Sequence, residues 1–185
     1  MSLRKILFVG IPGSGKGTQA NALVPYGFKN IGTGEIIREA WKRNDPLVIP
    51  YKAHIESGGF LPDREVFQLI NRQIEKIGES DYVLDGAIRN LAQAEIAMQQ
   101  GLIGQVLCFF LDEEEAVRRL AKRYEIEGRA DDSPDVVVKR MLKYKKETEP
   151  VINYFLERMI PLHTINALPS ISKVHQEVLK ILKLK

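Results

Sequence analysis

Residues 10–18 have the types and spacing of a phosphate-binding loop. Gly10, Gly15 and Lys16 fit the pattern in which four residues separate two glycines and a lysine follows the second. Glycines let successive backbone N–H groups turn inward around a polyphosphate, and the lysine adds a mobile positive charge for its outer phosphates. Gly17 stands where the general pattern has the Ser or Thr that binds magnesium. The alternative is a glycine turn with a surface lysine.

Asp85 is a second candidate, because it follows the apolar run 82–84 and precedes a glycine. Phosphate-binding folds place an acid beside magnesium at such a strand end. Since Gly17 offers no hydroxyl, we expect Asp85 to act on Mg²⁺ through water. The alternative is a structural aspartate in a turn.

Four arginines surround a short glycine-containing segment further along the chain. Arg119 and Arg123 are four residues apart and so share one face of a helix, while Arg129 and Arg140 follow it. Phosphoryl transfer needs positive charge around the equatorial oxygens and a site that excludes water. A closing loop that carries arginines supplies both, whereas lone arginines are more often solvated surface residues.

The elements that must position these residues alternate along the chain. Apolar runs predict strands at residues 4–10, 28–31, 82–84, 105–111 and 163–166. Periodicity and capping residues predict helices at residues 15–24, 35–42, 51–56, 63–77, 92–100, 113–126, 133–158 and 172–182, the seventh kinked at Pro150. This alternation predicts an α/β fold, a parallel sheet with helices on both faces. Two strandless stretches, 32–61 and 124–134, are candidate flaps over a site at the strand ends.

Composition narrows the class of function. The 185 residues suffice for one domain, and a net charge of +3 suits small anionic substrates without suggesting a nucleic-acid surface. A single cysteine, Cys108, allows no internal disulfide and no cysteine-based zinc site. The apolar run that begins at Ile6 is too short for a signal peptide or a membrane span, so we expect a cytoplasmic protein with no membrane partner.

Nearly the whole chain resembles adenylate kinase, a nucleoside monophosphate kinase family with the P-loop NTPase fold. Separate motifs carry the resemblance in the family's order: residues 10–18, residues 32–35 with Arg38, residues 59–63, residues 85–89 with Gln93, and the group Arg123, Gly128, Arg129, Asp131, Asp132 and Arg140. Residues 148–152 match a further family run. Two positions depart from the pattern, since Ala87 and Ile88 replace the family's Phe-Pro.

The resemblance implies which residues form the site. Residues implied to bind ATP are Gly13, Ser14, Gly15, Lys16, Gly17, Thr18, Arg119, Arg123 and Pro169. Residues implied to bind AMP are Thr33, Arg38, Gly59, Phe60, Leu61, Gly86, Ala87, Ile88, Arg89, Gln93, Arg129 and Arg140. The implied catalytic residues are Lys16, Asp85, Arg119, Arg123, Arg129 and Arg140, of which the last two would bridge the nucleotides.

The resemblance also implies the organisation and the reaction. The expected single domain has a five-stranded core (1–31, 62–123 and 135–185), a helical insertion for the nucleoside monophosphate at 32–61 and a short lid at 124–134. The expected activity is reversible phosphoryl transfer from MgATP to AMP to give two ADP, which balances cellular adenine nucleotides. Mg²⁺ would be held largely through phosphates and water. Zinc is not expected, because the longer zinc-binding lid has no counterpart, and neither is a nucleic-acid partner or an oligomer.

Gln93 is predicted to select the base. It lies four residues after Arg89, so a helix across both would project them the same way, one towards the phosphate and one towards the base. A glutamine amide offers the donor and acceptor that adenine requires, and guanine reverses that pattern.

Three alternatives for the function stay open: a UMP/CMP kinase, a nucleotide-binding switch and a structural protein with a vestigial loop. This chain lacks the guanine-reading Asn-Lys-x-Asp that a nucleotide-binding switch typically has. Its intact Lys16 and Asp85 argue against a vestigial loop.

Overall fold

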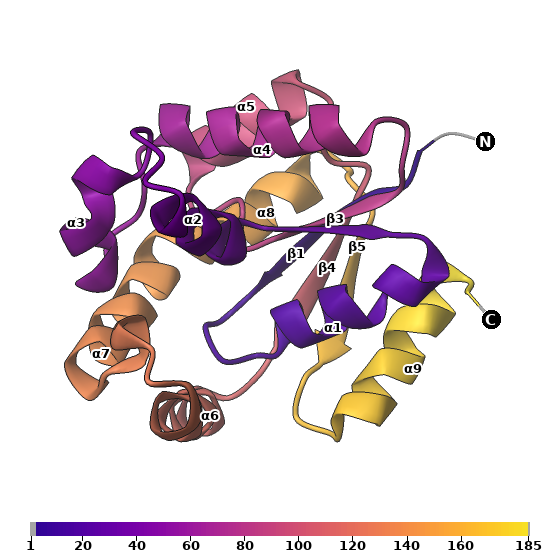
Figure 1. Ribbon diagram of the computed structural model, residues 1–185. Coiled ribbons are helices and arrows are strands. Elements are labelled where there is room, and N and C mark those ends of the chain that lie inside the picture. The colour runs from indigo at the N-terminus through magenta and orange to yellow at the C-terminus, as the bar shows by residue number, and fades with distance from the viewer. Residues whose placement is uncertain (1–2, 185) are drawn as a thin grey trace.

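The computed structural model describes residues 3–184 and contains a five-stranded parallel sheet with helices on both faces (Figure 1). The strands are β1 Lys5–Gly10, β2 Lys29–Gly32, β3 Tyr82–Asp85, β4 Gln105–Phe110 and β5 Leu162–Asn166. Their order is β2-β3-β1-β4-β5, and every neighbouring pair is parallel. After β1 the chain forms β2 and β3 on one side of it, and later β4 and β5 on the other side. The strand order thus reverses at β1, and parallel sheets bind ligands at the carboxyl end of the strand where this happens. All five predicted strands are present, with ends shifted by at most one residue.

The helices connect these strands in the predicted order. They are α1 Lys16–Ala22, α2 Thr33–Lys42, α3 Lys52–Glu56, α4 Asp63–Ile77, α5 Leu91–Gln99, α6 Glu113–Glu127, α7 Pro134–Lys143, α8 Pro150–Glu157 and α9 Ile171–Leu182. Short 3₁₀ turns occupy Val24–Tyr26 (η1), Ile49–Tyr51 (η2) and Ala130–Asp132 (η3). The first helix ends earlier than predicted because the N–H of Leu23 bonds to Ala20, which tightens the last turn. Pro25 lies inside the 3₁₀ turn that follows.

Alternate residues of the strands feed two hydrophobic cores. Ile6 and Phe8 of β1 belong to the core that also contains apolar residues of α1, α6, α7 and α9. Leu7 and Val9 belong to the core formed with α2, α4, α5 and α8. Figure 1 shows α4 and α5 along one side of the sheet and α1 and α9 along the other. Burial on both faces explains why β1 is continuously apolar in sequence.

The predicted helix at 133–158 is interrupted by a π turn at Tyr144–Thr148 (η4), which separates α7 from α8. The N–H of Glu149 donates to the carbonyl of Tyr144, five residues back, at 2.9 Å. Pro150 has no N–H, and its ring needs space beside the carbonyl four residues earlier, so the preceding turn widens. The kink was predicted at Pro150 itself, but the helix already departs from regular α geometry in the turn before it.

Two insertions meet beyond the carboxyl ends of the strands. The first carries α2, η2 and α3 between β2 and α4, and the second carries η3 between α6 and α7. Helix α3 contacts η3, and the backbone at Gly58 lies against Val136 of α7. The two predicted flaps are thus in contact with each other over the end of the sheet.

Glycines of the phosphate-binding loop differ in how much space surrounds them, which gives a matched test of the loop's packing. Gly13 has a φ of +87°, and a Cβ there would lie 2.7 Å from the carbonyl oxygen of Ala116 in α6. Gly15 has a similar φ of +82° but meets nothing within 4 Å. We expect Gly13→Ala to lower the free energy of unfolding by about 2 kcal/mol more than Gly15→Ala, because both carry the backbone strain and only the first adds a clash. Urea denaturation measures this difference, and equal losses would contradict the close approach of loop and helix.

Candidate functional site

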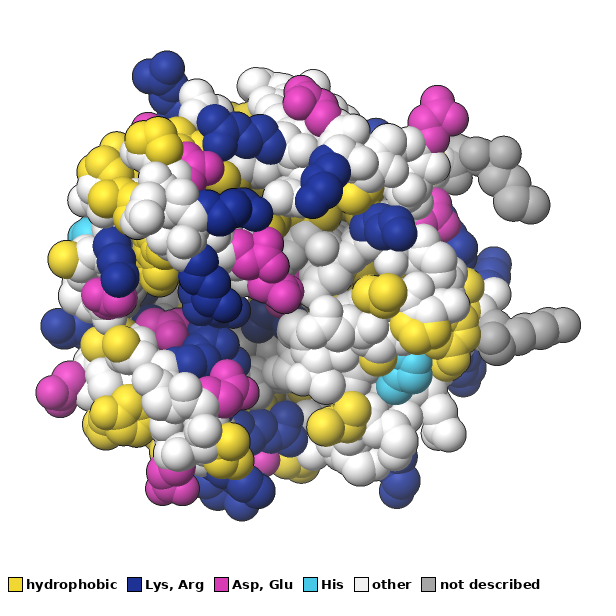
Figure 2. All heavy atoms as spheres, in the orientation of Figure 1, with side chains coloured by type: hydrophobic (Ala, Val, Ile, Leu, Met, Phe, Trp, Pro, Cys, Tyr) yellow, Lys and Arg dark blue, Asp and Glu magenta, His cyan; other side chains and the backbone are white. Residues whose placement is uncertain are grey.

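Two connected cavities lie at the carboxyl ends of the strands. The first, about 580 Å³, is bordered by the phosphate-binding loop, Asp85 and residues of α6, and the second, about 450 Å³, lies between α2, α3 and the lid. They share seven lining residues: Gly34, Arg38, Phe60, Gly86, Arg89, Arg129 and Arg140. Figure 2 shows Lys and Arg side chains gathered around a hollow on this face. The wall between the cavities is therefore strongly positive.

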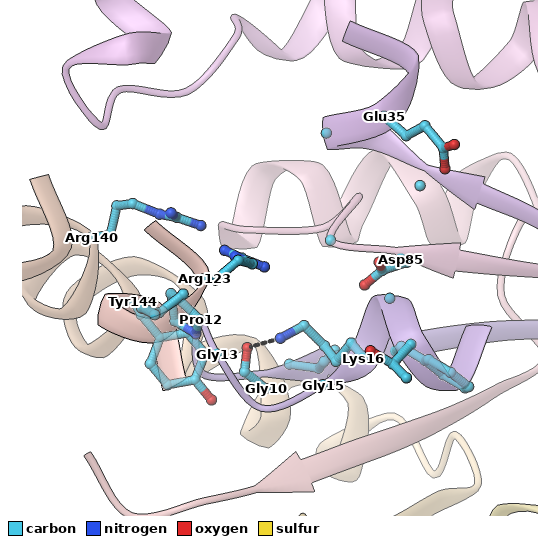
Figure 3. Close-up of a pocket in the computed structure, with 18 of the residues that line it drawn as sticks. Gly10, Pro12, Gly13, Gly15, Lys16, Glu35, Asp85, Arg123, Arg140 and Tyr144 are labelled. Carbon is cyan, nitrogen blue, oxygen red and sulfur yellow. Dashed lines mark hydrogen bonds between the residues drawn. The ribbon is translucent and has the colours of Figure 1, made fainter. Parts of the chain in front are cut away.

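Lys16 is buried within the loop that carries it. Its Nζ donates to the carbonyl oxygen of Gly10 at 2.7 Å (Figure 3). It also donates to the carbonyl oxygen of Ile11 at 2.9 Å and to the hydroxyl of Ser14 at 3.0 Å. Burial lowers the pKa of Lys16 to about 8, although the nearby carboxylate of Asp85 opposes this shift. The ammonium thus has three neutral acceptors in place of a counter-ion. Ser14 is itself buried and does not border the first cavity.

Asp85 ends β3 and faces the same cavity. Within residues 3–184 its carboxylate makes no hydrogen bond or ion pair, and burial raises its pKa while Lys16 opposes the rise. A Cβ at Gly17 would lie 3.1 Å from Oδ2 of Asp85, so a glycine here lets the helix approach the acid. The carboxylate of Glu35 also borders the cavity and contributes to the raised pKa of Asp85 (Figure 3). Glu35 was counted in the motif at residues 32–35 but was given no role from the sequence, and the structure places it in the first turn of α2.

Two arginines on the shared wall have unused hydrogen-bonding capacity. Arg38 makes no hydrogen bond or ion pair in the part of the chain that the structure describes. Arg89 donates from Nε to the carbonyl of Gly86 at 2.8 Å, and its terminal nitrogens have no partner among the same residues. Burial lowers the pKa of both guanidinium groups, that of Arg89 to about 10. Desolvated, unpaired guanidinium groups that border one space form a binding site for an anion.

Two aspartates of η3 pair with the other two arginines of the shared wall, Arg129 and Arg140, and with Arg123 of the first cavity. Arg123 binds the buried Asp132 through two hydrogen bonds of 2.5 and 2.8 Å. Arg140 donates to the same carboxylate at 2.6 Å, and Arg129 binds Asp131 through two hydrogen bonds of 2.8 and 3.1 Å. Although burial opposes it, the hydrogen bond from Arg129 and the charge of Arg140 lower the pKa of Asp131 to about 2. Arg123 and Arg140 point into the space above the phosphate-binding loop (Figure 3).

Arg119 of α6 also borders the first cavity. Its terminal nitrogens donate to the carbonyl oxygens of Ala167 at 2.9 Å and Leu168 at 3.1 Å. These bonds fix the turn between β5 and α9 relative to α6. Pro169, predicted to meet the ATP adenine, is exposed and does not border the cavity, whereas Ile171 does. This turn carries no motif, and the contact of Pro169 with ATP stays a prediction.

The second cavity is more apolar, with Ile37, Trp41, Ile55, Leu61 and Val66 among its lining residues. The predicted residues that it brings together are Thr33, Arg38, Gly59, Phe60, Leu61, Gly86, Ala87, Arg89, Gln93, Arg129 and Arg140. The first cavity collects Gly13, Gly15, Lys16, Gly17, Thr18, Asp85, Ile88, Arg119 and Arg123. Ile88, expected with the second group, thus faces the first cavity.

Gln93 is buried at the edge of the second cavity rather than solvated. Its amide nitrogen donates to Oδ1 of Asp63 at 2.7 Å, and its Oε1 accepts the N–H of Arg89 at 2.7 Å. Arg89 precedes helix α5, whose N-cap Asn90 accepts a hydrogen bond from the N–H of Gln93. The prediction that Arg89 and Gln93 project from one helix face is therefore wrong, because the helix begins after Arg89. Instead, the side chain of Gln93 binds the backbone N–H of Arg89.

Comparison with known proteins identifies the family. A family model described as adenylate kinase matches residues 8–160. The chain belongs to the adenylate kinase family. It is 36% identical to an adenylate kinase of Thermus thermophilus over 94% of each chain, and 38% identical to one of Micrococcus luteus over 85% of this chain and 80% of that protein. It is 34% identical to adenylate kinase 1 of a Nostoc species over 95% of this chain and 97% of the relative. The predicted P-loop NTPase fold and family membership are confirmed.

The described residues do not meet the requirements of a membrane-spanning helix or of a cluster of metal-binding side chains. No helix among residues 3–184 is long and apolar enough to cross a membrane. Nor do His, Cys, Asp and Glu side chains in that range gather in groups of three or more that could hold a metal ion.

The lowered pKa of Lys16 predicts an alkaline limit for the reaction. The ammonium is present below its pKa and lost above it, so kcat/KM for MgATP should fall as pH rises through about 8. Bound phosphates favour the charged form, so the limit on kcat should lie at higher pH. Lys16→Arg should lower activity but abolish the fall of kcat/KM at alkaline pH, because a guanidinium stays charged. If kcat/KM of this variant still falls through the same pH range, another group titrates there.

Proposed function

We propose that the chain catalyses MgATP + AMP ⇌ 2 ADP by holding the two nucleotides in the two cavities, with their phosphates meeting at the shared wall. The observation that carries this proposal is the wall itself. Arg38, Arg89, Arg129 and Arg140 border both cavities, and the phosphate-binding loop opens into only one of them. Two anions, one bound by the loop, would meet there. We further propose that the protein works in the cytoplasm as a monomer.

The first cavity suits ATP. The loop glycines leave backbone N–H groups for the phosphates, and Lys16 exchanges its three neutral acceptors for the transferred phosphoryl group. Asp85 and Glu35 form a donor set that Mg²⁺ accepts through water, since Mg²⁺ keeps several waters and needs only one or two carboxylates. Bound there with ATP, Mg²⁺ would neutralise phosphate charge. Arg119 and Arg123 complete the ATP side.

The second cavity suits AMP. Arg38 and Arg89 bring unpaired guanidinium groups to its phosphate, and the apolar residues around Trp41 enclose a base. Gln93 keeps one amide hydrogen and one lone pair beyond its bonds to Asp63 and Arg89, enough for the donor and acceptor of adenine.

Arg129 and Arg140 stand between the nucleotides. Asp131 and Asp132 hold them in place before charge develops on the transferred group, so little reorganisation is needed in the transition state. Contact between α3 and η3 closes the space above the phosphates and excludes water, which would otherwise hydrolyse the donor. Catalysis therefore comes from positioning and electrostatics, without a covalent intermediate.

Comparison of AMP, CMP, UMP and GMP as phosphoryl acceptors tests the proposed substrate. With ATP as donor, kcat/KM should be highest for AMP and lower for CMP, UMP and GMP, because guanine would leave buried groups of the base site unpaired at a cost of about 1–3 kcal/mol. Gln93→Asn should move the ratio towards the pyrimidines. A reaction without acceptor measures plain hydrolysis and serves as the control. UMP or CMP turned over as efficiently as AMP would make this a pyrimidine nucleotide kinase.

Variants of the unpaired Arg38 and of the paired Arg129 and Arg140 should differ in which kinetic constant they change. Arg38→Ala removes an unpaired cation beside the AMP phosphate and should raise KM for AMP about tenfold or more. Arg129→Ala and Arg140→Ala should instead lower kcat about a hundredfold or more with smaller effects on ATP affinity, because they meet charge that develops during transfer. Steady-state kinetics with calorimetry of ATP binding separate these effects. Loss of ATP affinity with kcat preserved would make Arg129 and Arg140 plain binding residues.

A further inference from the structure

We propose that Thr148 is a positioning residue for the monophosphate site: its hydroxyl, on the π turn, fixes the backbone of Arg89 so that the guanidinium faces both cavities. The inference rests on the proposed function, because it takes Arg89 as a ligand of the AMP phosphate. None of the roles implied by the resemblance involves Thr148.

Side chains hold both backbone groups of Arg89. The hydroxyl of Thr148 donates to its carbonyl oxygen at 2.8 Å, and its N–H donates to Oε1 of Gln93 at 2.7 Å. Thr148 and Gln93 are 7% and 1% exposed, so neither bond competes with bulk water. The two clamps come from parts of the chain 55 residues apart, which makes the position of Arg89 depend on tertiary structure.

The local chain restrains Arg89 only in part, through Gly86 and Gln93. Arg89 lies between β3 and α5, outside any helix or strand, so no regular ladder satisfies its peptide groups. Ala87 and Ile88, which precede it, do not restrict φ as a proline would. A buried carbonyl without a partner is costly, and the hydroxyl of Thr148 supplies that partner.

The π turn places Thr148 at this carbonyl. Arg140, Tyr144 and Thr148 are spaced by four residues, and all three border the first cavity. In a regular α-helix each step of four residues drifts by roughly 40° around the axis, so the third would turn away by roughly 80°. A π turn has more residues per turn and reverses part of this drift. The wide turn at Tyr144–Thr148 thus keeps Thr148 on the face that carries Arg140.

Arg89 needs this support because its guanidinium has few restraints of its own. Only Nε is bonded, to the carbonyl of Gly86, and the group lies 4.8 Å from the ring centroid of Phe60. Its terminal nitrogens stay available for a phosphate in the described structure. A shift of the Arg89 backbone therefore moves the phosphate ligand directly, and small misplacements of such groups lower affinity and rate.

Hydroxyl-specific variants test the proposal. Thr148→Val keeps the shape and removes the hydroxyl, and Thr148→Ser keeps the hydroxyl and removes the methyl group. We expect Thr148→Val to raise KM for AMP about three- to tenfold, with KM for ATP changed less than about twofold. Thr148→Ser should return KM for AMP to within about twofold of the wild-type value. Thermal unfolding of each variant checks folding, and Thr148→Ala replaces the valine variant if that one does not fold.

Three results would overturn the proposal: unchanged KM for AMP without the hydroxyl, equal rises for AMP and ATP, or equal impairment of the serine and hydroxyl-free variants, which would assign the effect to packing. The wild-type enzyme separates this inference from the proposed function. Wild-type protein that forms no ADP from ATP and AMP overturns both, whereas an active wild type with an unaffected Thr148→Val overturns only the role of Thr148.

Discussion

Repulsion among buried cations is the constraint on which this site depends. Six arginines and Lys16 border the first cavity, four of the arginines also border the second, and burial lowers the pKa of several of these groups. Two acids in one 3₁₀ turn, Asp131 and Asp132, neutralise Arg123, Arg129 and Arg140. Arg38 and the terminal nitrogens of Arg89 have no partner among residues 3–184. A phosphate bound in this space, as proposed above, would reduce the repulsion among these cations.

This arrangement also explains why the two insertions lie in contact. The lid turn is fixed by its aspartates to Arg123 of α6 and Arg140 of α7, and α3 of the other insertion rests on the same turn. The same ion pairs thus orient the wall and shape the roof of the cavities. Partial burial makes these pairs more sensitive to the loss of one partner than surface pairs are, because the remaining charge has no water to solvate it.

The strands and the family were predictable from the sequence, and all the predicted site residues except Ser14 and Pro169 line the cavities, because each depends on a local signal. Buried parallel strands read as apolar runs, and the motifs fall at their carboxyl ends. Long-range partners were not predictable: no local signal pairs Arg89 with Thr148, or leaves Arg38 without a partner among the described residues. The relation of Arg89 to Gln93 was predicted wrongly although Asn90, a favourable N-cap, marks the start of α5. Roles of individual residues in binding and catalysis stay predictions.

The π turn has a consequence for how the chain can vary. Val137 and Met141 of α7 belong to one hydrophobic core, and Val151 and Phe155 of α8 belong to the core on the other face of the sheet. The extra residue of the turn sets the phase between these halves. Losing it would rotate α8 by roughly 100° relative to α7 and turn both apolar pairs out of register. We therefore expect relatives to differ in length within surface loops but to align across residues 137–155 without gaps.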